Sequence, residues 1–217
     1  MSIPLSREIV YPESDGKPMG ETELHRQEIT YVIEALAHRF REAADVYVNG
    51  DMFLYYEEGN PRAVVCPDVM VVPGSSKLVR RIWKTWNEGG LIPSFVVEVT
   101  SRDTRSEDLG KKKDLYERLG VEEYFLYDPL EEYLSPRLRG YRRIEGRFQP
   151  VRLRRDGSLD SQTTGVTFRT EGDRLRLSET ATGKPLLRAD EALIRLEAAE
   201  AELARLRAEL EQRKRPD

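Results

Sequence analysis

Two carboxylates stand inside segments of the sequence that are otherwise almost entirely apolar. Asp68 lies in the run 64–72 and Glu98 lies in the run 94–100, and both runs are rich in β-branched residues. Such runs are typical of strands that are covered on both faces. A buried carboxylate is costly to keep ionised, and two close together also repel each other. A bound divalent cation would resolve both problems, because hard cations prefer oxygen ligands. The alternative is that each acid caps a turn at the end of a strand.

The strand alternation predicts which side chains share a face with Glu98. Side chains alternate along a strand, so Val96, Glu98 and Thr100 point to one side while the residues between them point to the other. Asp68 and Glu98 are then expected to face each other across adjacent strands.

The next predicted helix carries a lysine on the face that should pack against the sheet. The helix covers 107–119, and Gly120 ends it as a C′ glycine. At about 100° per residue, Asp108 lies within the apolar stripe and Lys112 lies at its centre. A lysine that faces the core needs an anionic partner or an open cleft, unless it snorkels to the helix edge. The apolar stripe consists of Leu109, Leu115, Tyr116 and Leu119, whereas Lys111 and Lys113 fall outside it.

Taken in order, these residues resemble a known family. Pro67-Asp68, the run 97–101, the series Asp108-x3-Lys112-x3-Tyr116-x3-Gly120 and Asp128-Pro129 are similar to the Uma-type restriction endonucleases. These enzymes belong to the PD-(D/E)xK nuclease superfamily. The opening segments 12–19 and 21–25 also resemble the N-terminus of that family, and the resemblance spans about residues 10–175.

The resemblance implies both a fold and an activity. The implied fold is α/β and restriction-endonuclease-like, with a mixed central sheet, flanking helices, added β segments and a C-terminal helix. The implied activity is that of an endonuclease that depends on Mg²⁺, or on Mn²⁺, and hydrolyses phosphodiester bonds in DNA. The residues implied are Asp68, Glu98 and Lys112 for catalysis, Asp68, Glu98 and the carbonyl of Val99 for the metal, and Asp108, Tyr116 and His25 as auxiliary residues.

The chain departs from the superfamily pattern at one position. The lysine of that pattern stands two residues after the second acid, where this sequence has Thr100. The resemblance suggests that Lys112 takes over from the following helix. Two alternatives remain open: a non-cleaving module of the same fold that binds nucleic acid or a partner protein, and a structural dimer whose acids bind metal only for stability.

The elements that must position these residues can be read along the chain. Residues 1–20 are rich in Pro and Gly and are predicted to form an extended arm. A helix is predicted over 22–41, with His25 on its apolar face as a half-buried residue or, alternatively, at the edge of the site. A strand–turn–strand follows over 45–56, and 123–128 is a further short strand. The segment 73–90 is a polar connection, either a flap over the acids or a loop with a short helix.

A series of short β segments is predicted over 130–180, and arginines are concentrated there. Between positions 137 and 155 eight arginines stand against one acid, with two aromatic residues among them. Arginine and aromatic side chains on a strand suit phosphate contacts and base stacking. The alternative is a solvated strand face whose arginines pair with acids elsewhere. The predicted contacts to nucleic acid are Arg142, Arg143, Arg152 and Arg154.

The C-terminal segment 188–217 has the spacing of a coiled coil. Small and apolar residues recur there at intervals of three and four, with Glu and Arg between them. We expect a helix that joins two copies of the chain into a homodimer, although three heptads could also form a lone solvated helix. The predicted division of the chain is therefore an arm (1–20), a restriction-endonuclease-like domain (21–180) and a helical tail (188–217).

Composition sets further limits. The net charge of −4 argues neither for nor against nucleic acid as a partner. One cysteine, Cys66, allows no disulfide framework, which is typical of a reducing cytoplasm, and two histidines with one cysteine cannot build a Cys/His zinc site. No apolar run approaches the ~20 residues needed to span a bilayer, and no signal peptide opens the chain. The expectation is a soluble cytoplasmic protein without a membrane partner.

Overall fold

The computed structural model describes residues 9–14, 16, 22–102 and 104–213. The chain divides into two compact units, 1–186 and 187–217. Most of the predicted arm, 1–20, lies outside the described residues, and the three predicted domain boundaries remain a prediction.

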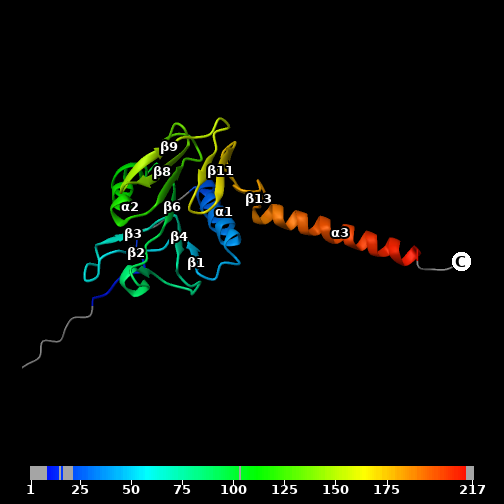
Figure 1. Cartoon of the computed structure of the whole chain (residues 1–217), viewed down its shortest axis with the longest axis horizontal. Coiled ribbons are helices and arrows are strands. Elements are labelled where there is room, and N and C mark those ends of the chain that lie inside the picture. Colours follow the sequence, from blue (N-terminus) through cyan, green and yellow to red (C-terminus); the bar gives the residue numbers. More distant parts are fainter. Residues whose placement is uncertain (1–8, 15, 17–21, 103, 214–217) are drawn as a thin grey trace, which may run out of the picture. The chain divides into compact units, whose positions relative to one another are not determined.

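The first unit is built on a six-stranded mixed sheet (Figure 1). Strands β6 and β7 run parallel, and every other neighbouring pair is antiparallel. This arrangement, with its flanking helices, confirms the predicted α/β class with a mixed central sheet. The strands in spatial order are β1 (Val46–Asn49), β4 (Val69–Pro73), β6 (Phe95–Val99), β7 (Glu123–Tyr127), β8 (Leu138–Ile144) and β9 (Arg147–Val151).

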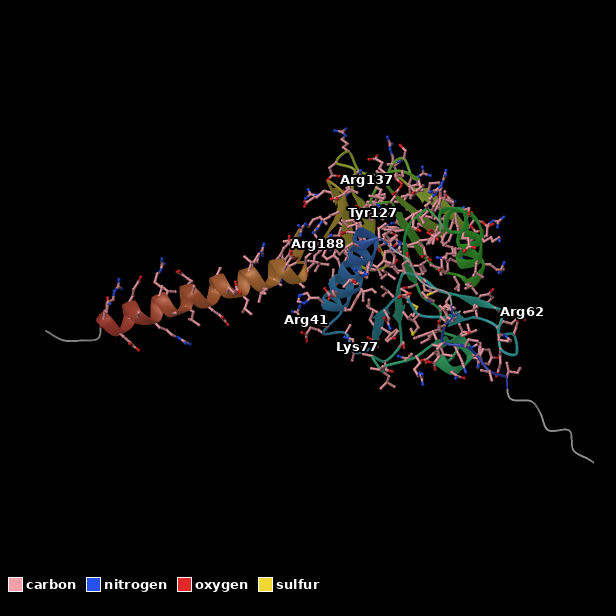
Figure 2. All side chains as sticks on the ribbon, turned by 180° about the vertical axis from the view of Figure 1, so that it is seen from behind. Arg41, Arg62, Lys77, Tyr127, Arg137 and Arg188 are labelled. Carbon is pink, nitrogen blue, oxygen red and sulfur yellow. The ribbon has the colours of Figure 1, made fainter. Side chains whose placement is uncertain are left out.

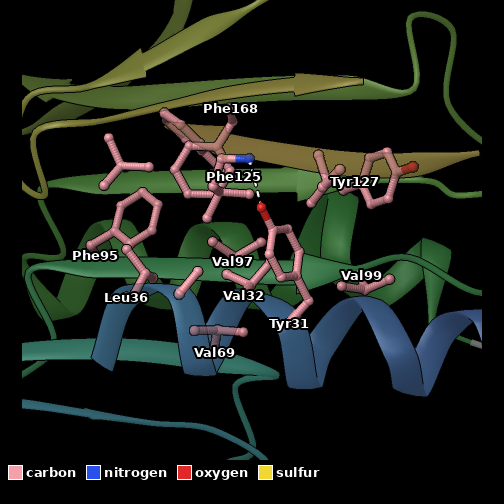
Figure 3. Packing of buried hydrophobic residues seen from close by; sticks show 14 of the residues in the cluster. Tyr31, Val32, Leu36, Val69, Phe95, Val97, Val99, Phe125, Tyr127 and Phe168 are labelled. Atoms are coloured by element: carbon pink, nitrogen blue, oxygen red, sulfur yellow. Dashed lines mark hydrogen bonds between the residues drawn. The ribbon is translucent and has the colours of Figure 1, made fainter. Parts of the chain in front are cut away.

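One face of this sheet is covered by helix α1 (Glu23–Arg39) and by a second, antiparallel sheet. Figure 3 shows Val32 and Leu36 of α1 against Val97 of the central sheet, with Phe125 and Phe168 beside them. These side chains are fully buried, so the outer cover and the central sheet share one core. The strands of the second sheet are β10 (Leu159–Ser161), β11 (Val166–Glu171), β12 (Arg174–Glu179) and β13 (Pro185–Leu186).

A buried tyrosine connects α1 to the second sheet. The Tyr31 hydroxyl donates to the carbonyl of Leu186 at 2.8 Å and accepts from the amide of Leu177 at 2.9 Å. Figure 3 shows this phenol between the helix and the strands. The N-terminal end of α1 is capped by Thr22, whose side chain accepts a hydrogen bond from the amide of His25 at 3.2 Å.

The C-terminal end of α1 is capped by a lysine from another element. The Lys77 ammonium donates to the carbonyls of Phe40 at 2.7 Å and Arg41 at 2.9 Å. Figure 2 labels Arg41 and Lys77 side by side at this end of the helix. A cation here satisfies carbonyls that the helix leaves unpaired and complements the helix dipole.

The opposite face of the central sheet carries a different cover. Helix α2 (Lys113–Leu119) and a three-stranded sheet pack on Val96, Tyr124 and their neighbours in a second hydrophobic core. This small sheet contains β3 (Val64–Val65), β2 (Leu54–Tyr55) and β5 (Trp83–Lys84), and the 3-10 helix η1 (Thr85–Glu88) follows it. The segment 73–90 is therefore a connection with a short helix, as one of its two predicted alternatives states.

The predicted continuous strand over 64–72 was wrong. The structure breaks it into β3 and β4, which belong to different sheets. Pro67 lies at the break and cannot donate a ladder hydrogen bond, while its carbonyl accepts from the amide of Asp51 at 2.9 Å. The segment 45–56 likewise supplies β1 to one sheet and β2 to another. Cys66, at the break, is partly exposed and not the buried residue that a continuous strand would require.

The second unit consists of helix α3 (Ala189–Arg213), which agrees with the predicted C-terminal helix. No residue of α3 is buried, and its side chains project from the helix on all sides in Figure 2. None of the helices in the described part of the chain is both long and apolar enough to cross a membrane.

Candidate active site

Asp68, the residue just before β4, lies next to Glu98 of β6. Val69 is opposite Val97 in the antiparallel register, so the next pair is Asp68 and Glu98. A backbone amide from each segment donates a hydrogen bond to the carboxylate on the other. The amide of Val99 donates to Asp68 Oδ2 at 2.7 Å, and the amide of Asp68 donates to Glu98 Oε2 at 3.3 Å. The two acids point to the same face of the sheet, the one that α2 covers.

The backbone at Asp68 depends on the close approach of Gly50. A Cβ atom at Gly50 would lie 1.8 Å from the carbonyl oxygen of Asp68, a distance that no side chain can tolerate. Only glycine permits this approach. Gly50 therefore lets the backbone of the first acid pack directly against the end of β1.

A π-helical segment brings the lysine to these acids. Segment η2 (Glu107–Lys112) is π-helical and leads directly into α2. Lys112 Nζ lies 2.9 Å from Glu98 Oε2 and 3.1 Å from Asp108 Oδ1, and its side chain is only 15% exposed. Lys112 is thus an internal partner of two carboxylates and does not snorkel to the helix edge.

The flanking residues complete the contacts of Glu98 and separate the three lysines. The Tyr116 hydroxyl donates to Glu98 Oε1 at 2.7 Å, so both oxygens of this fully buried carboxylate are engaged. Lys111 is exposed, and Lys113 places its ammonium 4.8 Å from the centre of the Tyr141 ring. Only the middle lysine of the three reaches the carboxylates.

The acids carry more negative charge than one lysine compensates. Burial raises the pKa of Asp68 to about 7 and that of Glu98 to about 7, although the charge of Lys112 opposes both shifts. Burial, together with the charge of Glu98, also raises the pKa of Asp108 to about 6. Burial alone would lower the pKa of Lys112, but the three carboxylates raise it above its ordinary value. A cation bound here would relieve this excess of negative charge.

The metal-free protein is expected to become less stable as the pH rises from about 5 to about 8. Because burial raises the pKa of Asp68 and Glu98, the folded state holds protons there that the unfolded chain has already lost. Thermal unfolding in EDTA should give a midpoint that falls across this range. The Asp68→Asn/Glu98→Gln protein should show a shallower fall, because burial still raises the pKa of Asp108, whereas Asp51→Asn, at an exposed acid nearby, should behave like wild type. A wild-type midpoint that rises with pH would contradict the expectation.

A cleft of about 780 Å³ opens on these residues. One wall comes from β2, β3 and their flanks, with Phe53, Tyr56 and Val65, and the other comes from η2 and α2, with Lys111 and Arg118. Asp68 and Lys112 line the cleft between the two walls. The sequence carried no chemical signal for the first wall, because its residues are ordinary aromatic and apolar ones on two-residue strands.

The donor set fits a divalent cation such as Mg²⁺. Within the described ranges, no three His, Cys, Asp or Glu side chains are arranged to hold a metal ion. Mg²⁺ does not require such a group, since one or two carboxylates usually hold it while waters and substrate phosphates complete its octahedron. Asp68, Glu98 and a backbone carbonyl meet that need, and the uncompensated charge described above favours a cation.

His25 contacts the backbone next to Glu98. Its ring is 3% exposed, so it is fully buried rather than half-buried, and Nε2 contacts the carbonyl oxygen of Val99. This is the carbonyl that the family resemblance names as a metal ligand. Thr100, in the position of the superfamily lysine, is buried as well, and its hydroxyl forms no hydrogen bond with any described residue.

The arginines between 137 and 155 are divided by strand alternation. Arg142 points to the α1 side, where its Nε lies 2.7 Å from Glu123 Oε1, while Arg143 is exposed. Arg154 is exposed but paired with Asp160. Arg143 and Arg152 are exposed and form no ion pair with any residue that the structure describes. The structure also pairs Arg137 with Glu131 and Arg147 with Glu117.

Most of the chain matches the model of a known protein family. The model of the Uma2 family, described as "Putative restriction endonuclease", matches residues 8–176. A crystal structure of a "putative nuclease belonging to DUF820" from Anabaena variabilis ATCC 29413 is 15% identical, with a TM-score of 0.49. That match covers 70% of this chain and 81% of the other. No curated protein matches the chain.

Proposed function

Since the chain belongs to the Uma2 family, we propose that it is a metal-dependent endonuclease that hydrolyses phosphodiester bonds in DNA. The family supports a nuclease in general. The observation that supports a working site is the contact of Lys112 with Glu98 and Asp108, on the same sheet face as Asp68. A helix-borne ammonium thus lies beside the acids although Thr100 stands in the usual lysine position.

In this proposal Asp68, Glu98 and the Val99 carbonyl hold Mg²⁺, or Mn²⁺, which has similar ligand preferences. The ion would acidify a bound water and offset charge on the phosphate. Asp68 is suited to this role because it lines the cleft and the amide of Val99 fixes the position of its Oδ2. Glu98 contributes from the floor of the site, where Tyr116 fixes one of its oxygens.

Lys112 is proposed to act on the reacting groups directly. An ammonium donates up to three hydrogen bonds and coordinates no cation. It can therefore orient the attacking water or stabilise the negative charge that develops on the phosphate. Asp108 holds the ammonium in place, and His25 holds the Val99 carbonyl. Both are positioning residues in this scheme.

The test is cleavage of supercoiled plasmid in Mg²⁺ or Mn²⁺ by wild type and by Asp68→Ala. Wild type is expected to nick or linearise the plasmid, and Asp68→Ala is expected to lose that activity. Asp51→Ala is the matched control, because Asp51 is an exposed acid in the same cleft. Equal nicking by wild type and Asp68→Ala would contradict the proposal.

The competing function is a non-cleaving module that binds nucleic acid or a partner protein. Thr100 in the lysine position favours it. A module of this kind would bind DNA without Mg²⁺-dependent cleavage. A protein whose unfolding midpoint rises with Mg²⁺ but which neither cleaves nor binds DNA would instead be one that uses metal only for stability.

The arginine contacts to DNA are also a proposal, and the structure ranks them. Arg143→Gln/Arg152→Gln should lower the slope of log affinity against log salt by about 0.9 for each DNA phosphate that the protein no longer neutralises. Arg154 should contribute less because it is paired with Asp160, and Arg142 should contribute least because Glu123 engages it internally.

The salt slope should be measured by fluorescence anisotropy with labelled duplex DNA. Arg147→Gln is the matched control, because Arg147 is exposed on the same strands but is paired with Glu117. An unchanged slope in the Arg143→Gln/Arg152→Gln protein would assign these residues to a solvated face.

A further inference from the structure

Helix α3 exposes a line of large apolar side chains. Leu196, Leu203, Leu206 and Leu210 are between 44% and 56% exposed, and no described residue of the helix is buried. Together with Ala199 they follow the alternating spacing of three and four residues, on one side of the helix. Calling Leu196, Leu203 and Leu210 the a positions makes Ala199 and Leu206 the d positions of a heptad.

The residues that flank this line are charged in a specific order. The g positions, just before each a position, are Arg195, Glu202 and Glu209, and the e positions, just after each d position, are Glu200 and Arg207. In a parallel, in-register pair of helices, each g residue faces the e residue five positions further along the other copy. Arg195 then faces Glu200, and Glu202 faces Arg207, in both directions across the pair.

The antiparallel alternatives lack this match. An antiparallel alignment that keeps the leucines together places Glu202 opposite either Glu202 or Glu209 of the other copy. Like charges at such positions oppose pairing. Within the helix, Glu202 uses Oε1 to contact Arg205, which lies on the outer side, so Oε2 remains for a partner.

We propose that α3 is the docking surface for a second copy of this chain, bound in a parallel, in-register pair through Leu196, Ala199, Leu203, Leu206 and Leu210. The flanking charges select the orientation. The proposal concerns assembly and is independent of whether the protein cleaves DNA.

Charge-swapped chains test it directly. Arg195→Glu/Arg207→Glu makes every flank residue from 195 to 207 acidic, and Glu200→Lys/Glu202→Lys makes every one basic. Each full-length variant should dimerise at least roughly tenfold more weakly than wild type. Mixed together they should form a heterodimer, because all facing pairs are then of opposite charge. Glu197→Lys/Glu211→Lys changes the net charge by the same amount as Glu200→Lys/Glu202→Lys, but on the outer side of the helix. This variant should dimerise like wild type.

Sedimentation velocity and light scattering of the full chain over a range of concentrations give the readout. Wild type that remains a monomer at every concentration would overturn the proposal. Charge-swapped variants that each dimerise like wild type, or that fail to combine when mixed, would also overturn it.

A cross-link distinguishes the orientation. In a Cys66→Ser background, Ala199→Cys places one thiol on each helix at a d position, where parallel in-register helices bring position 199 opposite itself. Mild oxidation should then give a covalent dimer in high yield, and Glu197→Cys on the outer side should give little. A wild-type dimer whose Ala199→Cys form does not cross-link more than Glu197→Cys would overturn the parallel register.

Discussion

Lys112→Ala is expected to reduce Mg²⁺-dependent DNA cleavage at least about a hundredfold, in line with the loss of one preorganised donor at a reaction centre. The ammonium lies 2.9 Å from Glu98 and 3.1 Å from Asp108, and its side chain is mostly buried. Among the described residues only Lys112 forms ion pairs with these acids, while Lys111 is exposed on the cleft wall and Lys113 lies over the Tyr141 ring. Cleavage of plasmid by the purified variant measures the effect.

The affinity for Mg²⁺ should not fall together with cleavage. Lys112 occupies Glu98 Oε2, so its removal frees a carboxylate oxygen that a cation can use. Titration calorimetry should therefore show Mg²⁺ binding that is retained or tightened in Lys112→Ala. This separates a missing catalytic donor from a collapsed site.

Lys111→Ala and Lys113→Ala are the controls, and both should cleave nearly as well as wild type, because Lys111 lines the cleft wall without an ion pair to the described acids and Lys113 lies over the Tyr141 ring. If all three alanine variants cleave alike, Lys112 is a structural partner of the acids. Thr100 would then mark a site that has lost its catalytic lysine.

Glu123→Ala is expected to lower the free energy of unfolding by about 3–5 kcal/mol, the cost of removing one member of a buried ion pair. Its carboxylate is 1% exposed and accepts from Ser161 Oγ at 2.6 Å, from the amides of Gln162 and Thr163 at 3.1 Å each, and from Arg142 Nε at 2.7 Å. Its removal leaves all these donors without an acceptor, and it detaches the segment after β10 from the central sheet.

The charge of Glu123 is part of this effect. Burial by itself would raise the pKa of Glu123, but the hydrogen bonds from Ser161, Thr163 and Arg142 outweigh it and lower the pKa below its ordinary value. The ionised form is thus the one that stabilises the fold. That contribution is present above the ordinary pKa of glutamate and is lost when acid protonates the group.

Urea unfolding at neutral pH measures the loss, and Glu122→Ala is the matched control because Glu122 is exposed. Glu122→Ala should change the free energy of unfolding by less than about 0.5 kcal/mol. Equal stability of the Glu122 and Glu123 variants would contradict the role of Glu123 as the acceptor that joins the two segments.

Short-range periodicity was enough to predict the geometry around Glu98. The alternation of the strand placed Asp68 and Glu98 on one sheet face, and the helical spacing placed Lys112 over them. The helical argument held although η2 is π-helical, because residues four apart remain on nearly the same side in both geometries. Local patterns sufficed for these three residues, although they missed the break at Pro67 that separates β3 from β4.

Contacts between short elements could not be predicted from the sequence, for a physical reason. β2, β3 and β5 are two residues long, so no period reveals them, and β5 pairs with β2 from almost thirty residues further along the chain. The wall of the cleft that β2, β3 and their flanks form could not be predicted. The run of arginines over 137–155 likewise did not predict which face of the sheet each side chain lies on. Arg142 and Arg143 lie on opposite faces of one strand. Glu123, which accepts from Arg142, was predicted only to be part of a strand.

The π-helical turn makes the site sensitive to chain length. A π turn holds one more residue than an α turn, so it behaves as an insertion that the helix has absorbed. Gly110, inside it, has open space where a Cβ would stand, so this position has room for a side chain. Loss of a single residue there would return the segment to α-helical pitch and rotate Asp108 relative to Tyr116. Among relatives of this chain, substitutions at Gly110 should therefore accumulate more freely than insertions or deletions in 107–112.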